Sequence, residues 1–313
     1  MKASGTAGDV APGSCGQGAI GTGVVPDPDQ RNLRKAVLIM LLGIALFSVL
    51  NGVVKDQAAR FPVNQIVFFR NAFALPPLIL VLVMTGSLHR LRTRKMPRHL
   101  AHALTMTAML MLSFTGFRLI PLAEATVISF VRPLVVILLA APLLGEKVSL
   151  LSWLTVLAGF AGVLVVVQPG GGGLAQGGAL FSLAAAFIGG INMLQLRALS
   201  MTDHTAGVAV WFLALSSLML LPTLFFSWES PSDADLTGLI GMGLASGLCQ
   251  YLIMRPLAYA GAAALAPVQY TGLLWSIAIG WLCFGDAPTA DVLLGSAMVV
   301  GATMLVLRGG RPG

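Results

Sequence analysis

Ten apolar runs, each near the length of a membrane-spanning helix, constrain this chain more than any other feature. A helix that crosses the hydrocarbon core of a bilayer needs about 20 mostly apolar residues. The runs cover residues 36–54, 65–86, 100–117, 122–142, 150–168, 179–199, 206–226, 237–257, 262–284 and 291–307. The sequence therefore predicts an all-α integral membrane protein with ten transmembrane helices.

The composition agrees with a lipid-covered surface rather than a water-covered one. Apolar residues make up 57% of the 313 residues and charged residues only 10%, whereas a soluble domain carries roughly 25% charged residues. The net charge of +7 could suggest a nucleic-acid partner. The basic residues instead cluster in short segments between the apolar runs, which is typical of membrane proteins. We therefore expect the lipid bilayer, and no nucleic acid, as a partner.

The distribution of Lys and Arg predicts the orientation, because cytoplasmic loops of membrane proteins are enriched in both residues. If the amino terminus is cytoplasmic, only Lys55, Arg60 and Arg118 fall in outer segments. The inner segments then hold Lys2, Arg31, Arg34, Lys35, Arg90, Arg92, Arg94, Lys95, Arg98, Lys147, Arg197, Arg308 and Arg311. Both termini are therefore predicted to be cytoplasmic.

The chain matches itself at an offset near 140 residues. Residues 142–149 and 282–289 each carry a Gly-acid turn between two apolar runs, and Asn51 falls opposite Asn192. Each half holds five spans, and an odd number makes the two halves enter the membrane in opposite directions. Such inverted repeats have two nearly equivalent packings, with a site at their interface near the midplane. The pattern favours a transporter over a duplication that only builds a larger bundle.

The predicted organisation has five parts. They are a flexible cytoplasmic tail (1–34), a first repeat (35–168), a glycine-rich linker (169–178), a second repeat (179–308) and a short cytoplasmic tail (309–313). The tail is rich in glycine and proline and cannot order a core. The linker lacks the Gly-Lys-Ser/Thr of a phosphate-binding loop. The three cysteines are scattered, so we expect no disulfide framework and no metal site.

Several short motifs resemble those of a known family. Pro121–Pro133, running on to Leu144-Gly145-Glu146, resembles the fourth helix and following turn of the drug/metabolite transporter superfamily, EamA type. Ala266–Tyr270 with Phe284–Pro288 resembles the second copy of that pattern, and Gln65–Asn71 resembles the start of its second helix. The resemblance implies a ten-helix secondary carrier of a bacterial-type inner membrane. It implies no cofactor and no nucleotide hydrolysis, with transport driven by a proton or solute gradient.

The same resemblance leaves the substrate open. It is compatible with export of an amino-acid-like or opine-type metallophore, and with uptake of riboflavin or S-adenosylmethionine. The expected partners are a small-molecule substrate and the bilayer, with monomer and homodimer both open. A membrane enzyme is disfavoured because the chain has no His-Glu-x-x-His motif. A receptor is disfavoured because no signalling domain is attached.

Arg132 is the sharpest candidate site residue. It lies about ten residues into the fourth run, roughly 15 Å from either end at 1.5 Å per residue, and Pro133 follows it. A charge at that depth requires a partner or a water-filled cavity, and a proline inside a helix favours a kink. We expect Arg132 to contact a polar or anionic substrate, with a structural ion pair as the alternative.

Two further charged residues are candidates for gating or coupling. Arg70 lies in the outer third of the second run and Glu124 at the outer end of the fourth. The two side chains are predicted either to pair across helices or to close an outer gate. Glu124 is also the candidate for proton coupling, with plain exposure at the membrane interface as its alternative.

Polar residues of the ninth run complete the predicted binding site. Gln269, Tyr270 and Trp275 offer amide, phenol and indole groups suited to a polar aromatic or amphiphilic solute. Asn51 and Asn192 are predicted to join them. For each of these residues, hydrogen bonding between helices is an equally good interpretation.

Overall fold

The computed structural model describes residues 30–93, 95–144, 150–167, 174–258, 265 and 268–309. Within these residues every regular element is a helix. The predicted Gly145-Glu146 turn, residues 168–173 of the linker region, most of the amino-terminal tail and residues 310–313 lie outside the described part. The prediction of an all-α protein is confirmed for the part that is described.

The helices follow one another with short connections. Their bounds are α1 (Gln30–Arg60), α2 (Val63–Met84), η1 (Leu88–Leu91), α3 (Met96–Leu119), α4 (Leu122–Ser129), α5 (Arg132–Leu144), α6 (Leu150–Val167), α7 (Leu174–Ser200), α8 (Thr205–Leu224), α9 (Asp233–Met254), η2 (Arg255–Ala258), α11 (Thr271–Phe284) and α12 (Ala290–Gly309).

Seven helical segments in the described part are long and apolar enough to cross a membrane. They are Arg34–Arg60, Val63–Met84, Met96–Leu119, Leu122–Leu139, Gly177–Ser200, Thr205–Leu224 and Asp233–Met254. Shorter apolar helices cover Leu157–Val167, Thr271–Phe284 and Ala290–Gly301. Large apolar side chains such as Leu104, Leu157 and Leu218 are more than half exposed on the outside of the bundle. The protein is therefore a multi-pass membrane protein, with lipid as the solvent for these faces.

The fourth apolar run is interrupted, as the position of its proline predicts. α4 ends at Ser129, α5 begins at Arg132, and Phe130 and Val131 lie between them. In a continuous helix the ring of Pro133 would clash with the preceding residues. Proline also has no backbone N–H to donate a hydrogen bond across the break. The break leaves Arg132 and Pro133 in the first turn of α5, where proline is tolerated.

The glycine-rich segment was predicted to be a linker, but part of it is helical. α7 begins at Leu174, so Gly177 and Gly178 lie in a helix. A Cβ atom on Gly178 would come within 2.7 Å of Leu119 Cβ and 2.6 Å of the Ile120 side chain. Gly178 is therefore required for the close approach of α7 to the end of α3, as small residues are elsewhere in membrane bundles.

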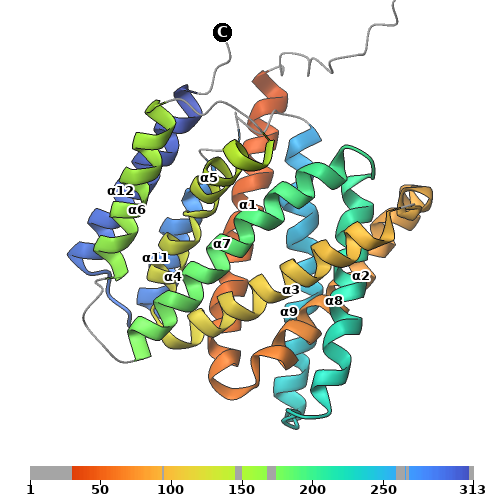
Figure 1. The fold of residues 1–313 in the computed structure, drawn as a ribbon. Coiled ribbons are helices and arrows are strands. Elements are labelled where there is room, and N and C mark those ends of the chain that lie inside the picture. The colour runs from red at the N-terminus through yellow and green to blue at the C-terminus, as the bar shows by residue number, and fades with distance from the viewer. Residues whose placement is uncertain are drawn as a thin grey trace, which may run out of the picture.

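Figure 1 shows how the helices are arranged. α6 packs chiefly on α12 at one edge of the bundle, while α2, α8 and α9 form the opposite edge (Figure 1). α3 packs along α7, and the broken helix α4–α5 lies centrally with α1 and α11. Buried polar contacts join the opposite edge: Asn71 Nδ2 of α2 donates to Ser216 Oγ of α8 at 2.8 Å, and Thr107 of α3 donates to the same oxygen at 2.7 Å. The central helices thus frame the space in which a site can form.

Candidate functional site

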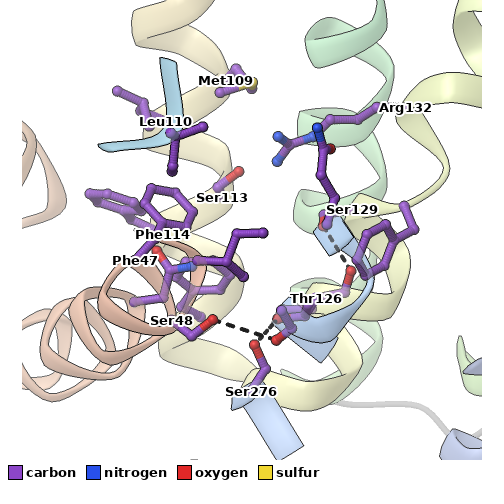
Figure 2. A pocket seen from close by; sticks show the side chains of 18 of the residues that line it. Phe47, Ser48, Met109, Leu110, Ser113, Phe114, Thr126, Ser129, Arg132 and Ser276 are labelled. Carbon is purple, nitrogen blue, oxygen red and sulfur yellow. Dashed lines mark hydrogen bonds between the residues drawn. The ribbon is translucent and has the colours of Figure 1, made fainter. Parts of the chain in front are cut away.

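A cavity of about 380 Å³ lies among the central helices. It receives side chains from α1, α2, α3, α4, α5, α7, α9 and α11. Its volume lies within the range of small-molecule sites, roughly 300–1,000 Å³. Figure 2 shows part of the lining, with α3 on one side and the α4–α5 break on the other.

The cavity wall combines apolar surface with uncharged polar groups and cations. The aromatic side chains are Phe47, Phe114, Phe117 and Phe130. The polar side chains are Ser48, Asn51, Arg70, Ser113, Thr126, Ser129, Arg132, Ser182, Gln250, Gln269 and Ser276. None of the Asp and Glu residues in the described part lines the cavity. The site is therefore electropositive and amphiphilic.

Arg132 enters the cavity from the first turn of α5 (Figure 2). Its Nε atom is buried with no hydrogen-bond partner in the described part of the protein. The side chain passes directly over Gly189 of α7, where an added Cβ atom would lie 2.9 Å from Arg132 Cδ and 3.0 Å from Nε. Gly189 therefore makes room for a guanidinium that forms no ion pair with any described residue.

Arg70 enters the cavity from α2, and its guanidinium carbon lies 5.7 Å from the centroid of the Phe114 ring. This contact is a cation–π interaction. Arg70 also borders a smaller cavity of about 30 Å³ between α2, α8 and α9. No ion pair joins Arg70 to Glu124 among the described residues. The prediction that these two residues pair is therefore not met in this conformation.

The residues predicted from the ninth run differ in their positions relative to the cavity. Gln269 lines the cavity, as does Asn51 of α1. Tyr270 is not among the lining residues, and its ring centroid lies 5.1 Å from that of Phe130, which lines the cavity. Trp275 does not line the cavity and is 43% exposed. Its neighbour Ser276 faces inward, so Trp275 is turned away by roughly 100° around the helix.

Asn192 and Glu124 also lie outside the cavity lining. Asn192 Nδ2 donates to the backbone oxygen of His102 at 3.2 Å and to Thr105 Oγ1 at 3.0 Å. It therefore joins α7 to α3, which is the alternative expected for an amide in a membrane helix. Glu124 is half-buried at the start of α4 and interacts electrostatically with Asp286 and Lys55.

Contacts between α1, α4 and α11 span one end of the cavity. Ser48 Oγ donates to the backbone oxygen of Gly272 at 3.5 Å, and the hydroxyls of Thr126 and Ser276 are 3.0 Å apart (Figure 2). These four residues form a layer of hydroxyl and backbone groups across the space between the helices. We call it the hydroxyl layer.

An ion pair lies beyond the hydroxyl layer. Lys55 is two turns further along α1 than Ser48, about 10 Å at 1.5 Å per residue. Its Nζ atom donates to Asp286 Oδ2 at 2.6 Å and to the backbone oxygen of Ile120 at 3.3 Å. It also lies 5.0 Å from the centroid of the Phe284 ring. This cluster ties the end of α1 to the turn between α11 and α12.

Sequence reasoning did not find the hydroxyl and aromatic lining. Thr126, Ser129 and Arg132 are spaced three apart, which places them near one face of a helix. The sequence therefore did contain a signal for this part of the lining. The pairing of Lys55 with Asp286 had no such signal, because it joins residues 231 positions apart. No cluster of His, Cys, Asp or Glu suited to a metal occurs among the described residues.

Comparison with known proteins identifies the family. The model of the EamA-like transporter family matches this chain twice, at residues 35–168 and 176–308. A solved crystal structure superposes with a TM-score of 0.63 at 22% identity, covering 89% of this chain and 98% of that one. This similarity concerns the fold alone.

Three named relatives match over most of their length. The pseudopaline exporter CntI of Pseudomonas aeruginosa is 28% identical over 88% of this chain and 97% of that protein. A riboflavin transporter of Rhizobium johnstonii is 29% identical, covering 87% and 90% of the two chains. An S-adenosylmethionine uptake transporter of Rickettsia conorii is 24% identical, covering 85% and 90%. The family model covers most of the chain, and we conclude that this protein belongs to the EamA-like transporter family.

Proposed function

We propose that this protein is a secondary transporter that carries a small polar or amphiphilic metabolite across a bacterial-type inner membrane without nucleotide hydrolysis. The observation that carries this proposal is the central cavity, which combines aromatic walls, hydroxyl and amide groups and the guanidinium of Arg132, whose Nε has no hydrogen-bond partner among the described residues. Charged residues that face a cavity inside the membrane mark substrate pathways. The cavity is the substrate site, with Arg132, Gln269 and Asn51 in contact with the solute.

The proposal includes ten membrane spans arranged as two inverted repeats of five. The first repeat comprises α1, α2, α3, the broken helix α4–α5, and α6. The second comprises α7, α8, α9, the segment that ends in α11, and α12, which places the boundary near residues 168–173. The two matches of the family model, at 35–168 and 176–308, support this division.

The packing between the two halves also supports an inverted repeat. α1 packs on α9 and α11, and the corresponding α7 packs on α3 and on α4–α5. α2 packs on α9, and the corresponding α8 packs on α3. The pairs α2–α8, α4–α11 and α6–α12 join corresponding spans to each other. An approximate two-fold relation of this kind provides the two packings that alternating access requires.

With both termini cytoplasmic, the hydroxyl layer and the Lys55–Asp286 pair close the outer end of the cavity. Opening toward the outside then requires separation of α1 from α11, which breaks the 2.6 Å contact between Lys55 Nζ and Asp286 Oδ2. Glu124 adjoins this pair. We assign Glu124 to coupling, since a carboxyl beside the pair can bind a proton when the cluster separates. Arg70 is assigned to the cavity rather than to a gate.

Export of an amino-acid-like or opine-type compound is the first candidate for the direction and cargo. The named relative that exports pseudopaline supports it. Uptake of riboflavin is the second candidate, and the phenylalanine-rich wall favours it because flat rings stack well on aromatic side chains. These two candidates predict opposite net directions and different charges on the solute.

Two steps test the proposed function. Metabolites inside cells and in the medium are compared with and without the gene, and the compound that changes is loaded into sealed liposomes holding the purified full chain. Movement of that compound without nucleotide is the expected result. Failure of every compound that changes in cells to move across the liposome membrane would contradict the proposal.

A further inference from the structure

Two arginines from different helices line the same cavity. Arg132 lies on the wall formed by the α4–α5 break and packs against Gly189 of α7. Arg70 packs on the ring of Phe114, which belongs to α3. Figure 2 shows Phe114 and Arg132 on opposite sides of the space. The two positive charges therefore face one cavity from separate positions rather than forming one cluster.

Neither guanidinium has a negative partner in the described part of the protein. Arg132 and Arg70 form no ion pair there, and no Asp or Glu lines the cavity. Removing a charge from water costs several kcal/mol unless a counter-charge and hydrogen bonds replace the water. Two partly buried cations that face one cavity, with no anion lining it among the described residues, are therefore an arrangement that an incoming anion would stabilise.

The donors of both guanidiniums also remain available. No hydrogen bond from Arg132 or Arg70 to a described residue is formed, and Arg132 Nε is buried and unpaired. A guanidinium offers a planar fork of donors that matches a carboxylate or phosphate bidentately. The contact of Arg70 with Phe114 uses the face of the guanidinium and leaves its edge free.

We propose that the cavity selects a solute with two separate acid groups, one bound by Arg132 and one by Arg70, that also carries an amphiphilic or aromatic group. The phenylalanine side chains and the hydroxyls of Ser113 and Ser129 lie on the wall for that group. An amino group on the solute meets only hydroxyls and amides, so the bound species carries net negative charge. Organic cations are rejected, and neutral solutes bind more weakly. This inference rests on the cavity being the substrate site of the proposed transporter.

The test uses probes of one shape and different charge with the purified full chain in detergent. The first three probes are N-benzoylglutamate with two negative charges, its α-amide with one, and its diamide with none. The fourth, N-benzoylornithinamide, carries one positive charge. Binding is measured by titration calorimetry and by the rise in melting temperature. Each charge-assisted contact is worth tenfold or more in affinity. We expect the diacid to bind at least about tenfold more tightly than the α-amide, and the cation to give no signal.

Single substitutions assign the two acid groups. Because each arginine binds one acid group, one of Arg132→Gln and Arg70→Gln should remove the preference for the diacid over the α-amide, and the other should weaken the binding of both probes and leave that preference. Arg118→Gln, at the exposed end of α3, should change neither. Arg132→Lys should retain part of the diacid affinity that Arg132→Gln loses, which separates loss of charge from loss of folding. Equal binding of diacid and diamide, absence of binding by every anionic probe, or tighter binding of the cation would overturn the inference. A binding order as expected, together with absence of solute movement in liposomes, would contradict the transport proposal alone.

Discussion

The ring of Phe130 packs against the ring of Tyr270, with centroids 5.1 Å apart and planes inclined by 33°. The two residues are 140 positions apart in the chain, which is the offset at which its halves resemble each other. Phe130 lies in the break between α4 and α5, and Tyr270 immediately precedes α11. The contact therefore joins the break between α4 and α5 to the start of α11, at positions that correspond in the two halves of the chain.

The same offset exposes a difference between the two halves. Arg132 corresponds to Gly272, and Ser48 corresponds to Gly189 at an offset of 141. Arg132 packs over Gly189 on one side, while Gly272 packs near Ser48 on the other. The contact is kept in both halves, but only one of them places a cation there. If the cavity is the substrate site, a solute would meet an asymmetric charge in a nearly symmetric frame, and we expect this charge to set its orientation.

Arg132 gives the first prediction. Replacement by alanine removes the unpaired guanidinium from the cavity and should lower uptake into liposomes by tenfold or more, while the protein stays folded. The uptake by Arg132→Lys should fall between that of the parent protein and that of Arg132→Ala, because an ammonium keeps the charge without the bidentate fork. Initial rates over a range of substrate concentrations check this, with Arg118→Ala as the matched control. Unchanged affinity and rate in Arg132→Ala would remove Arg132 from the site.

Gly189 gives the second prediction, which concerns the position of Arg132 rather than its charge. In Gly189→Ala the new methyl group would lie 2.9 Å from Arg132 Cδ and 3.1 Å from Met109 Sδ, so the guanidinium must shift. We expect weaker solute binding with little loss of protein yield. Gly177→Ala is the control on the same helix, because nothing lies within 4 Å of the added atom. Equal affinity in the two variants would show that the guanidinium position is not critical.

Gly243 gives a prediction about stability alone. A Cβ atom there would lie 2.5 Å from Phe73 Cβ and 2.6 Å from the Phe69 backbone oxygen. Gly243→Ala should therefore separate α2 from α9 and cost about 1–3 kcal/mol, as overpacking does. Gly238→Ala on the same helix has open space and should be neutral or slightly stabilising. Melting temperatures in detergent compare the two, and equal values would contradict the packing described here.

The Lys55–Asp286 pair gives a prediction about access. Lys55→Ala and Asp286→Ala each break the tie between α1 and α11, so each should favour opening at that end of the cavity. The measurement is the rate at which an impermeant thiol reagent added from outside modifies Ser276→Cys, in a chain whose native cysteines are replaced. Both variants should react faster than the parent, with Arg60→Ala as an exposed control. A rate that stays unchanged would mean that the pair does not hold the closed state.

Glu124 gives a prediction about coupling. A pH gradient should drive solute movement in the parent protein and fail to drive it in Glu124→Gln, because the amide cannot exchange a proton. Counterflow without a gradient should persist in the variant, since the cavity itself is intact. Glu229→Gln, in an exposed segment, serves as the control. Gradient-driven transport that survives in Glu124→Gln would assign coupling to another group.

Much of the membrane architecture could be predicted from the sequence, because it depends on local properties. The apolar runs predicted the helices, and Pro133 predicted the interruption beside Arg132. Arg132 and Gln269 were predicted as site residues, and both line the cavity; for Arg132 the signal was the cost of a charge inside the membrane. These signals are carried by single residues or short segments.

The rest depends on which way a helix is turned and on contacts far apart in the chain. Trp275 and Ser276 are neighbours, yet only Ser276 faces the cavity, and in a helix that is apolar all round no periodicity decides this. Asn192 could serve the site or join helices, and only packing against Thr105 decides between these roles. Lys55 was read as a loop residue because its partner Asp286 lies in the other half of the chain.

Alternating access of the central cavity is the core of this account, and two-sided labelling tests it most directly. Ser113, which lines the cavity, is replaced by cysteine in a chain without other cysteines, and the protein is reconstituted in one orientation. We predict that impermeant thiol reagents modify this cysteine from either side of the membrane, and that the transported solute slows both reactions. Modification from one side only, unaffected by the solute, would contradict the account.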